Sequence, residues 1–283
     1  MRIFLCCLLM LTFLCSGPFP ALAQETPSSE QTRLTDIQDN ANEDDSSIAK
    51  IGFELGLGYY QIRDHSLQNP HLFQGPLFGA ALVFERDSGP WRSGFRFNLG
   101  YSSHSDAYGL PGFSAINGFE VDTQRAMMKV GTQKQWTLFA GAFVREDIDL
   151  AMYPLIDEAH LYWLTSFSVG PAFTIERHAW ENTTVRAGVR FPVMAMVSRP
   201  PHERFINNDK DTFRYITTKL YENLTLRTPD QHFFVVGDAS IRFKLAENIE
   251  ETLGYRFTYI RNEEPSQLRI LSHSLFMNIS WRW

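Results

Sequence analysis

The stretch WRSGFRFNLGYSS, residues 91–103, decides the fold. Between Trp91 and Tyr101 most odd-numbered positions are apolar, and the even-numbered positions are arginine, asparagine or glycine. Successive side chains of a β-strand point to opposite faces of the sheet, so this period of two predicts a strand with one apolar and one polar face.

The same alternation recurs along the chain and predicts ten strands, at 51–62, 76–86, 91–103, 120–131, 136–145, 161–177, 183–197, 232–245, 249–260 and 268–283. They run to about 10–17 residues, whereas soluble strands average about five or six and a strand tilted across a bilayer needs about 9–11. The short connections are 87–90, 132–135, 178–182 and 246–248, and the long ones are 63–75, 103–119, 146–160, 198–231 and 261–267.

This alternation of short turns and long loops is typical of a transmembrane barrel with both termini in the periplasm. We therefore predict an all-β fold, an antiparallel up-and-down barrel of ten strands in the outer membrane. A secreted β-sandwich also alternates, but it predicts shorter strands and no rhythm of loop lengths. The strand-like segment 213–226 in the fourth long loop leaves twelve strands open as an alternative to ten.

The N-terminal region divides into two parts. Residues 1–23 read as a signal peptide, with an apolar run after Arg2 and the cleavage site Ala21-Leu22-Ala23; a lipoprotein signal ending at Cys15 is the alternative. The three cysteines lie in this segment, so we expect no disulfide and no thiolate metal ligand in the mature chain. Residues 24–48 are polar and acidic and predict a disordered periplasmic tail, which leaves 49–283 for the barrel.

Composition excludes several functional classes. The net charge of −6 argues against a nucleic-acid binder, and the mean hydropathy of −0.22 argues against a bundle of transmembrane helices. The sequence has no phosphate-binding glycine loop, zinc-protease motif or nucleophile elbow. We therefore expect no cofactor and no bound metal.

The last strand carries a resemblance. Met277, Ile279, Trp281 and Trp283 alternate up to the C-terminus, and together with the export signal and the alternating strands they resemble Gram-negative outer-membrane β-barrel proteins. In that class such a strand, usually ending in Phe rather than Trp, is read by the barrel-assembly machinery. The resemblance implies that machinery, outer-membrane lipid and lipopolysaccharide as partners.

The polar face of the strands predicts a basic barrel interior. It contains ten cations, which are Arg92, Arg96, Arg125, Lys129, Arg186, Arg190, Arg242, Lys244, Arg256 and Arg282, against the four anions Glu54, Glu176, Asp238 and Glu250. A barrel of this size is narrow enough for side chains to fill it. Two interpretations stay open: a packed network of ion pairs, or a narrow water-filled path that favours anions.

The predicted long loops are rich in histidine and acid. His104 with Asp106, and Asp230 with His232, have the spacing that puts both members on one side of an extended segment, where a carboxylate can orient a general base. The strand count resembles that of the omptin proteases, which place catalytic Asp and His residues across the barrel mouth, although their paired-Asp element is replaced here by His104-Ser105-Asp106. A further acidic group, Glu146, Asp147, Asp149, Asp157 and Glu158, is interpreted as a solvated loop face or as a site for Ca²⁺ or for metal-bridged lipopolysaccharide phosphates.

The leading functional hypothesis is therefore a non-enzymatic barrel, either a small pore with a basic lumen or a structural or surface-interaction protein. The alternative is an omptin-like or lipid-acting hydrolase that uses His104, Asp106, Asp230 and His232. The sequence leaves the ligand, the substrate and the oligomeric state open.

Overall fold

The computed structural model describes residues 47–283 except 66–71, 132–134, 156–159, 181, 200–203 and 206–218. The predicted signal peptide and nearly all of the predicted tail therefore lie outside the described residues. The strands are β1 (Ile48–Asp64), β2 (Leu72–Ser88), β3 (Trp91–Ser105), β4 (Pro111–Val130), β5 (Trp136–Tyr153), β6 (His160–Trp180), β7 (Thr183–Arg190), β8 (Met194–Ser198), β9 (Arg204–Phe205), β10 (Thr225–Arg227), β11 (His232–Ala246), β12 (Ile249–Asn262) and β13 (Leu268–Arg282). Within the described part of the chain, no helix has the length and apolar character needed to cross a bilayer.

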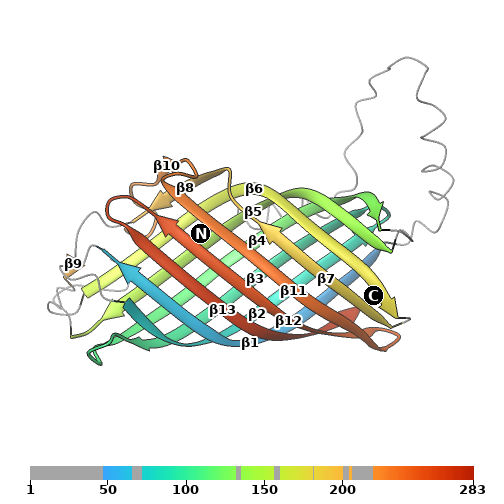
Figure 1. The fold of residues 1–283 in the computed structure, drawn as a ribbon, viewed down its shortest axis with the longest axis horizontal. Helices are drawn as coiled ribbons and strands as arrows, with labels where there is room; N and C mark the ends of the chain where they lie inside the picture. The colour runs from blue at the N-terminus through green and yellow to red at the C-terminus, as the bar shows by residue number, and fades with distance from the viewer. Residues whose placement is uncertain are drawn as a thin grey trace, which may run out of the picture. The chain divides into compact units, whose positions relative to one another are not determined.

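Ten of these strands close into a barrel (Figure 1). The ring runs β1–β2–β3–β4–β5–β6–β7–β11–β12–β13, each neighbour pair is antiparallel, and β13 pairs with β1 to complete it. Closure gives every ring strand a hydrogen-bonded neighbour on both sides, which hydrocarbon demands of a spanning sheet. The predicted all-β antiparallel barrel of ten strands is confirmed.

The seventh predicted strand, 183–197, is interrupted. Its first part, β7, pairs with β6 and β11, whereas its second part, β8, pairs with β6 and with the short strand β10. Gly170 of β6 lies opposite this interruption, where a Cβ would come within 2.1 Å of the carbonyl oxygen of Phe191. The described parts of 198–231 contain only the short strands β9 and β10 in addition.

Several strands extend further than predicted at the end of the barrel opposite the termini. The connection predicted at 103–119 is reduced to 106–110, and β5 continues to Tyr153. The reason is visible in β1, where Phe53 and Leu57 face outward with 45% and 64% exposure, but Tyr60 and Ile62 face inward and are fully buried. The apolar face changes sides without a break in the strand, as expected where lipid outside gives way to water and the interior becomes the dry side.

A β-bulge in β4 overturns one predicted assignment. Ala126 pairs with Phe139 but Met128 pairs with Leu138, so Met127 is an extra residue and the alternation shifts by one. Gln124 therefore faces inward and is fully buried. Arg125 faces outward, with its guanidinium carbon 5.6 Å from the ring centroid of Trp91. The prediction that Arg125 faces the interior is wrong, because the period was read across the bulge.

An apolar layer crosses the interior toward the end opposite the termini. It comprises Tyr60, Ile62, Phe73, Phe143, Ala151, Tyr153, Tyr162, Leu164, Ala172, Ala195, Val197, Phe234, Val236, Ile260, Leu268 and Ile270. The rings of Phe73 on β2 and Tyr153 on β5 lie 4.4 Å apart. The Tyr60 hydroxyl on β1 donates to Asp149 Oδ2 on β5 at 2.6 Å. Non-adjacent strands thus meet inside the barrel.

Candidate functional site

The candidate site is the barrel interior on the terminal side of the apolar layer. Inward-facing charged side chains form ion pairs there, and we call this set the charged layer: Lys50, Glu54, Glu85, Arg92, Arg96, Glu120, Arg145, Asp147, Glu176, Arg186, Arg190, Asp238, Arg242, Glu250 and Arg256. The alternation of each strand places these residues inward, where the narrow lumen brings opposite walls within reach of a side chain.

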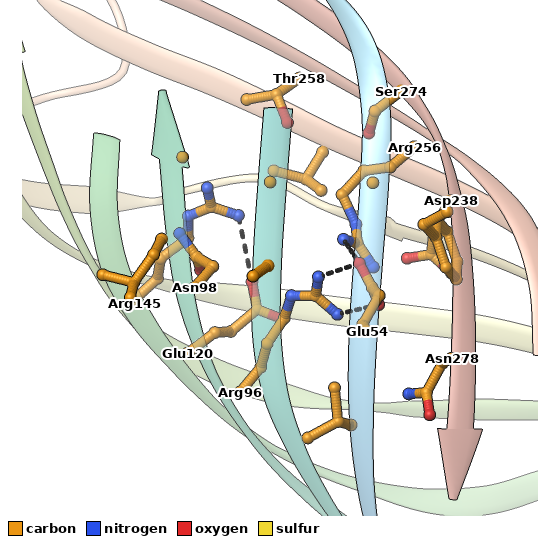
Figure 2. A pocket seen from close by; sticks show the side chains of 18 of the residues that line it. Glu54, Arg96, Asn98, Glu120, Arg145, Asp238, Arg256, Thr258, Ser274 and Asn278 are labelled. Atoms are coloured by element: carbon orange, nitrogen blue, oxygen red, sulfur yellow. Dashed lines mark hydrogen bonds and ion pairs between the residues drawn. The ribbon is translucent and has the colours of Figure 1, made fainter. Parts of the chain in front are cut away.

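Glu54 of β1 holds two arginines (Figure 2). Arg96 Nη1 lies 2.6 Å from Glu54 Oε2, and Arg256 Nη1 lies 2.9 Å from Glu54 Oε1. Glu54 is almost fully buried. A buried carboxylate between two guanidiniums satisfies both its own oxygens and the donors around it, which is the condition for burying charge without a large penalty.

Glu120 of β4 forms a second centre. It accepts a hydrogen bond from Arg145 of β5 at 3.3 Å and lies 2.9 Å from Arg190 Nε of β7. Arg190 also donates to Asp238 of β11 at 2.6 Å, and Arg145 donates to both oxygens of Asp147. This chain of ion pairs links four strands.

The widest links run through Glu85 and Arg92. Glu85 of β2 accepts hydrogen bonds from Arg186 of β7 at 3.0 Å and from Arg242 of β11 at 2.7 Å. Arg92 of β3 donates to Glu176 of β6 at 2.8 Å. These strands are not neighbours in the ring, so the contacts pass through the lumen.

The structure places the predicted interior residues as follows. Arg92, Arg96, Arg186, Arg190, Arg242, Arg256, Glu54 and Asp238 lie in the charged layer. Lys129 and Lys244, like Arg125, are exposed. The predicted large surplus of interior cations is wrong, because three further carboxylates face inward. Glu85, Glu120 and Asp147 each form an ion pair with at least one arginine.

A cavity of about 220 Å³ lies against the charged layer. Arg96, Arg256 and Glu120 line one part of it, and Tyr60 and Ile260 of the apolar layer line another. Gly56 and Gly79 also line it, and a Cβ at either position would have no neighbour closer than 3.6 Å. The missing side chains of these glycines thus leave the space open.

The two members of the first predicted Asp–His pair, His104 and Asp106, make separate contacts within the barrel. His104 is buried beside the rings of Tyr60, Phe73 and Tyr153, and its Nδ1 lies 3.4 Å from Ser102 Oγ. Asp106 Oδ1 accepts the backbone N–H groups of Tyr108 and Leu110 at 2.9 and 2.8 Å. That oxygen therefore closes the tight turn between β3 and β4.

The two members of the second predicted pair, Asp230 and His232, differ in burial. Asp230 is exposed in the turn before β11 and accepts a hydrogen bond from the Thr228 hydroxyl, which lowers the pKa of the Asp230 carboxyl below its ordinary value. His232 is buried, with Nδ1 3.3 Å from Asn262 Oδ1. Within the described ranges no hydrogen bond joins Asp230 to His232.

The predicted acidic loop face at 146–158 is wrong for its first three members. Glu146, Asp147 and Asp149 are buried in β5 and interact with Tyr221, Arg145 and Tyr60. Asp157 and Glu158 lie outside the described residues. Among the described residues no group of three or more His, Cys, Asp or Glu side chains is arranged to hold a metal ion.

The terminal alternation lies on the outward face. Met277, Ile279, Trp281 and Trp283 are all exposed there. Trp283 exchanges two backbone hydrogen bonds with Ala49, at 3.0 and 3.3 Å. The last residue thus extends the pairing between β13 and β1 that closes the barrel.

This chain has the fold of the outer-membrane β-barrel proteins. It is similar to the outer membrane protease OmpT from Escherichia coli, with a TM-score of 0.52, 6% identity, and coverage of 85% of this chain and 98% of OmpT. It is also similar to the translocator domain of autotransporter NalP from Neisseria meningitidis, with a TM-score of 0.44, 10% identity, and coverage of 90% and 95%. At these identities the likeness concerns the fold alone. Neither protein-family models nor curated protein sequences gave a match.

Proposed function

We propose that the protein is a non-conducting barrel of a Gram-negative outer membrane, with periplasmic termini. It acts through the surface at the end of the barrel opposite the termini, which we call the loop end, rather than as a pore. The observation that carries this proposal is the ion pairing of Glu85 with Arg186 and Arg242 across the lumen. It favours the structural or surface-interaction half of the leading hypothesis over an anion-selective channel.

The charged layer supports closure because its cations have fixed counter-ions. An anion pore needs cationic side chains that a mobile anion can reach. Here Arg92, Arg190 and Arg256 already lie within 3 Å of a carboxylate oxygen. A chloride ion would have to displace a wall carboxylate from a hydrogen-bonded ion pair, and breaking a buried pair costs several kcal/mol.

The apolar layer supports closure independently. Tyr60, Phe73 and Phe234 are at most 1% exposed although they face the lumen. Opening a water path would expose such side chains, at a cost of roughly 1.5–3 kcal/mol for each large apolar side chain. An ion would meet this layer even if the charged layer rearranged.

Solute uptake tests the proposal. Liposomes containing the purified full chain should admit small sugars and chloride no faster than liposomes containing no protein, while a general porin reconstituted in parallel should admit both. Rapid chloride uptake through the wild-type protein would overturn it.

The alternative function, an omptin-like or lipid-acting hydrolase, has no comparable support, because Asp230 is exposed and His232 is buried against Asn262.

A further inference from the structure

Three arginines stand side by side on the outer wall near the end of the barrel opposite the termini. Arg269 of β13 pairs directly with Arg63 of β1 on one side and with Arg261 of β12 on the other. We call these three residues the arginine row. Residues directly opposite in an antiparallel pair have Cβ atoms about 5 Å apart, and like charges at that spacing destabilise the sheet.

Only one member of the row has a counter-charge among the described residues. Arg261 Nε lies 3.1 Å from Glu263 Oε1, and its Nη2 donates to the backbone oxygen of Asp230. Arg63 and Arg269 are exposed, and within the described ranges neither side chain forms an ion pair or hydrogen bond. Two adjacent guanidiniums are therefore left for an external anion.

The outward residues below the row show where it lies relative to a membrane. Tyr59 and His273 lie four positions from Arg63 and Arg269 on the same two strands, toward the end of the barrel that carries the termini. They form an aromatic pair with ring centroids 5.8 Å apart. The next outward residues on these two strands, Leu57 and Leu275, are apolar and exposed. Aromatic side chains above an apolar band are typical of the membrane–water boundary of a barrel.

The length of β13 agrees with this placement. Arg269 and the outward Trp281, near the other end of the strand, are twelve residue steps apart. These steps span about 40 Å along the strand, or about 30 Å along the barrel axis at a tilt of roughly 40°. That matches the hydrocarbon thickness of a bilayer. The arginine row therefore stands at headgroup depth when Trp281 stands at the opposite interface.

We infer that the arginine row binds the phosphate groups of lipid headgroups in the leaflet that surrounds the loop end. A guanidinium offers a planar pair of donors that matches two phosphate oxygens, and a phosphate between Arg63 and Arg269 turns their repulsion into two charge-assisted contacts. The inference rests on the proposed residence in the outer membrane, whose outer leaflet would supply phosphorylated glycolipid.

Binding of lipid A to the full chain in a non-ionic detergent tests the site. The R63Q/R269Q variant should bind lipid A at least about tenfold more weakly than wild type, a loss of roughly 1.4 kcal/mol. The matched control is R125Q/K129Q, which removes two exposed charges elsewhere on the barrel and should bind as wild type does. Unchanged binding by R63Q/R269Q, or equal weakening by both variants, would overturn the inference.

Two further measurements distinguish a lipid site from a site for any anion. Inorganic phosphate at the same phosphate concentration should not displace lipid A, because it lacks the acyl chains that the apolar band contacts; full displacement would overturn the lipid source. In lipid-free detergent R269Q should melt at or above the wild-type temperature, and lipid A should raise the wild-type temperature more. A lower melting temperature without lipid would contradict unrelieved repulsion in the row. None of these results depends on whether the barrel conducts, so they fail or succeed separately from the proposed closure.

Discussion

Arg186 on β7 donates a hydrogen bond to Glu85 on β2 from the opposite side of the barrel, with 3.0 Å between nitrogen and oxygen. In the ring order the two strands are five steps apart in either direction, the largest separation that ten strands allow. A side-chain contact at that separation must pass through the lumen. The interior is thus braced by paired charges rather than lined with free ones.

Removing this brace should destabilise the barrel. Glu85→Gln leaves Arg186 and Arg242 without their shared carboxylate, and we expect a loss of about 3 kcal/mol in the free energy of unfolding. This is near the lower end for breaking a buried pair, because the Gln amide oxygen still accepts a hydrogen bond. Urea unfolding in lipid vesicles measures the loss.

Glu247 provides the matched control, since it is exposed in the turn between β11 and β12. Glu247→Gln should change the free energy of unfolding by less than about 0.5 kcal/mol. Equal effects of the two substitutions would show that Glu85 contributes no more than a surface charge.

The bulge at Met127 predicts which of two neighbouring positions is reachable from outside the barrel. Arg125→Cys should react rapidly with a maleimide on the folded protein, and Gln124→Cys should react only after unfolding, because Gln124 is fully buried. The three native cysteines lie within residues 1–23, so the predicted mature chain offers no competing thiol. The reverse labelling pattern would mean that the alternation continues unshifted through β4.

The bulge also marks the limit of what the sequence could predict. The number, direction and approximate position of the ring strands follow from period-two alternation, because an apolar outer face and a charged interior impose it. The same rule places Glu85 inward, since it lies between the outward Phe84 and Arg86, so the sequence does predict this interior carboxylate. No sequence pattern indicates that Met127 is unpaired, so a phase set by the outward Met128 and Val130 beyond the bulge gives the wrong face for both Glu120 and Arg125.

Period-two alternation does not predict the apolar layer, for a different physical reason. Reading apolar residues as outward-facing holds only where the outside is lipid. Beyond Tyr59 in β1 the polar residues Gln61 and Arg63 face outward, while Tyr60 and Ile62 face inward. The apolar face thus changes from the outer to the inner side of the same strand, and a pattern that assumes one environment ends the strand at that point.

Trp283 should be needed for assembly. Trp283 closes the β13–β1 pairing through its backbone, and its side chain is exposed. We expect Trp283→Glu to deplete the folded protein from the outer membrane, measured as the heat-modifiable band in membrane fractions. Trp180→Glu, which places the same charge at another exposed tryptophan at a strand end, should deplete it much less. Similar losses for both variants would argue against a specific terminal signal.

Surface accessibility tests the proposed orientation. An epitope inserted after Tyr108, which is 82% exposed in the β3–β4 connection, should be labelled on intact cells. An epitope within 132–135, in the β4–β5 connection at the other end, should be labelled only after the outer membrane is permeabilised. Labelling of the second epitope on intact cells would invert the topology.

Current recording across a planar bilayer tests the central claim, a lumen sealed by paired charges, most directly. The purified wild-type protein, with insertion verified by protease protection, should show no conductance steps in potassium chloride. Chloride-selective steps that lose their selectivity when Arg96 and Arg190 are both changed to Glu would contradict it, since they would require those arginines to face mobile anions rather than Glu54, Glu120 and Asp238.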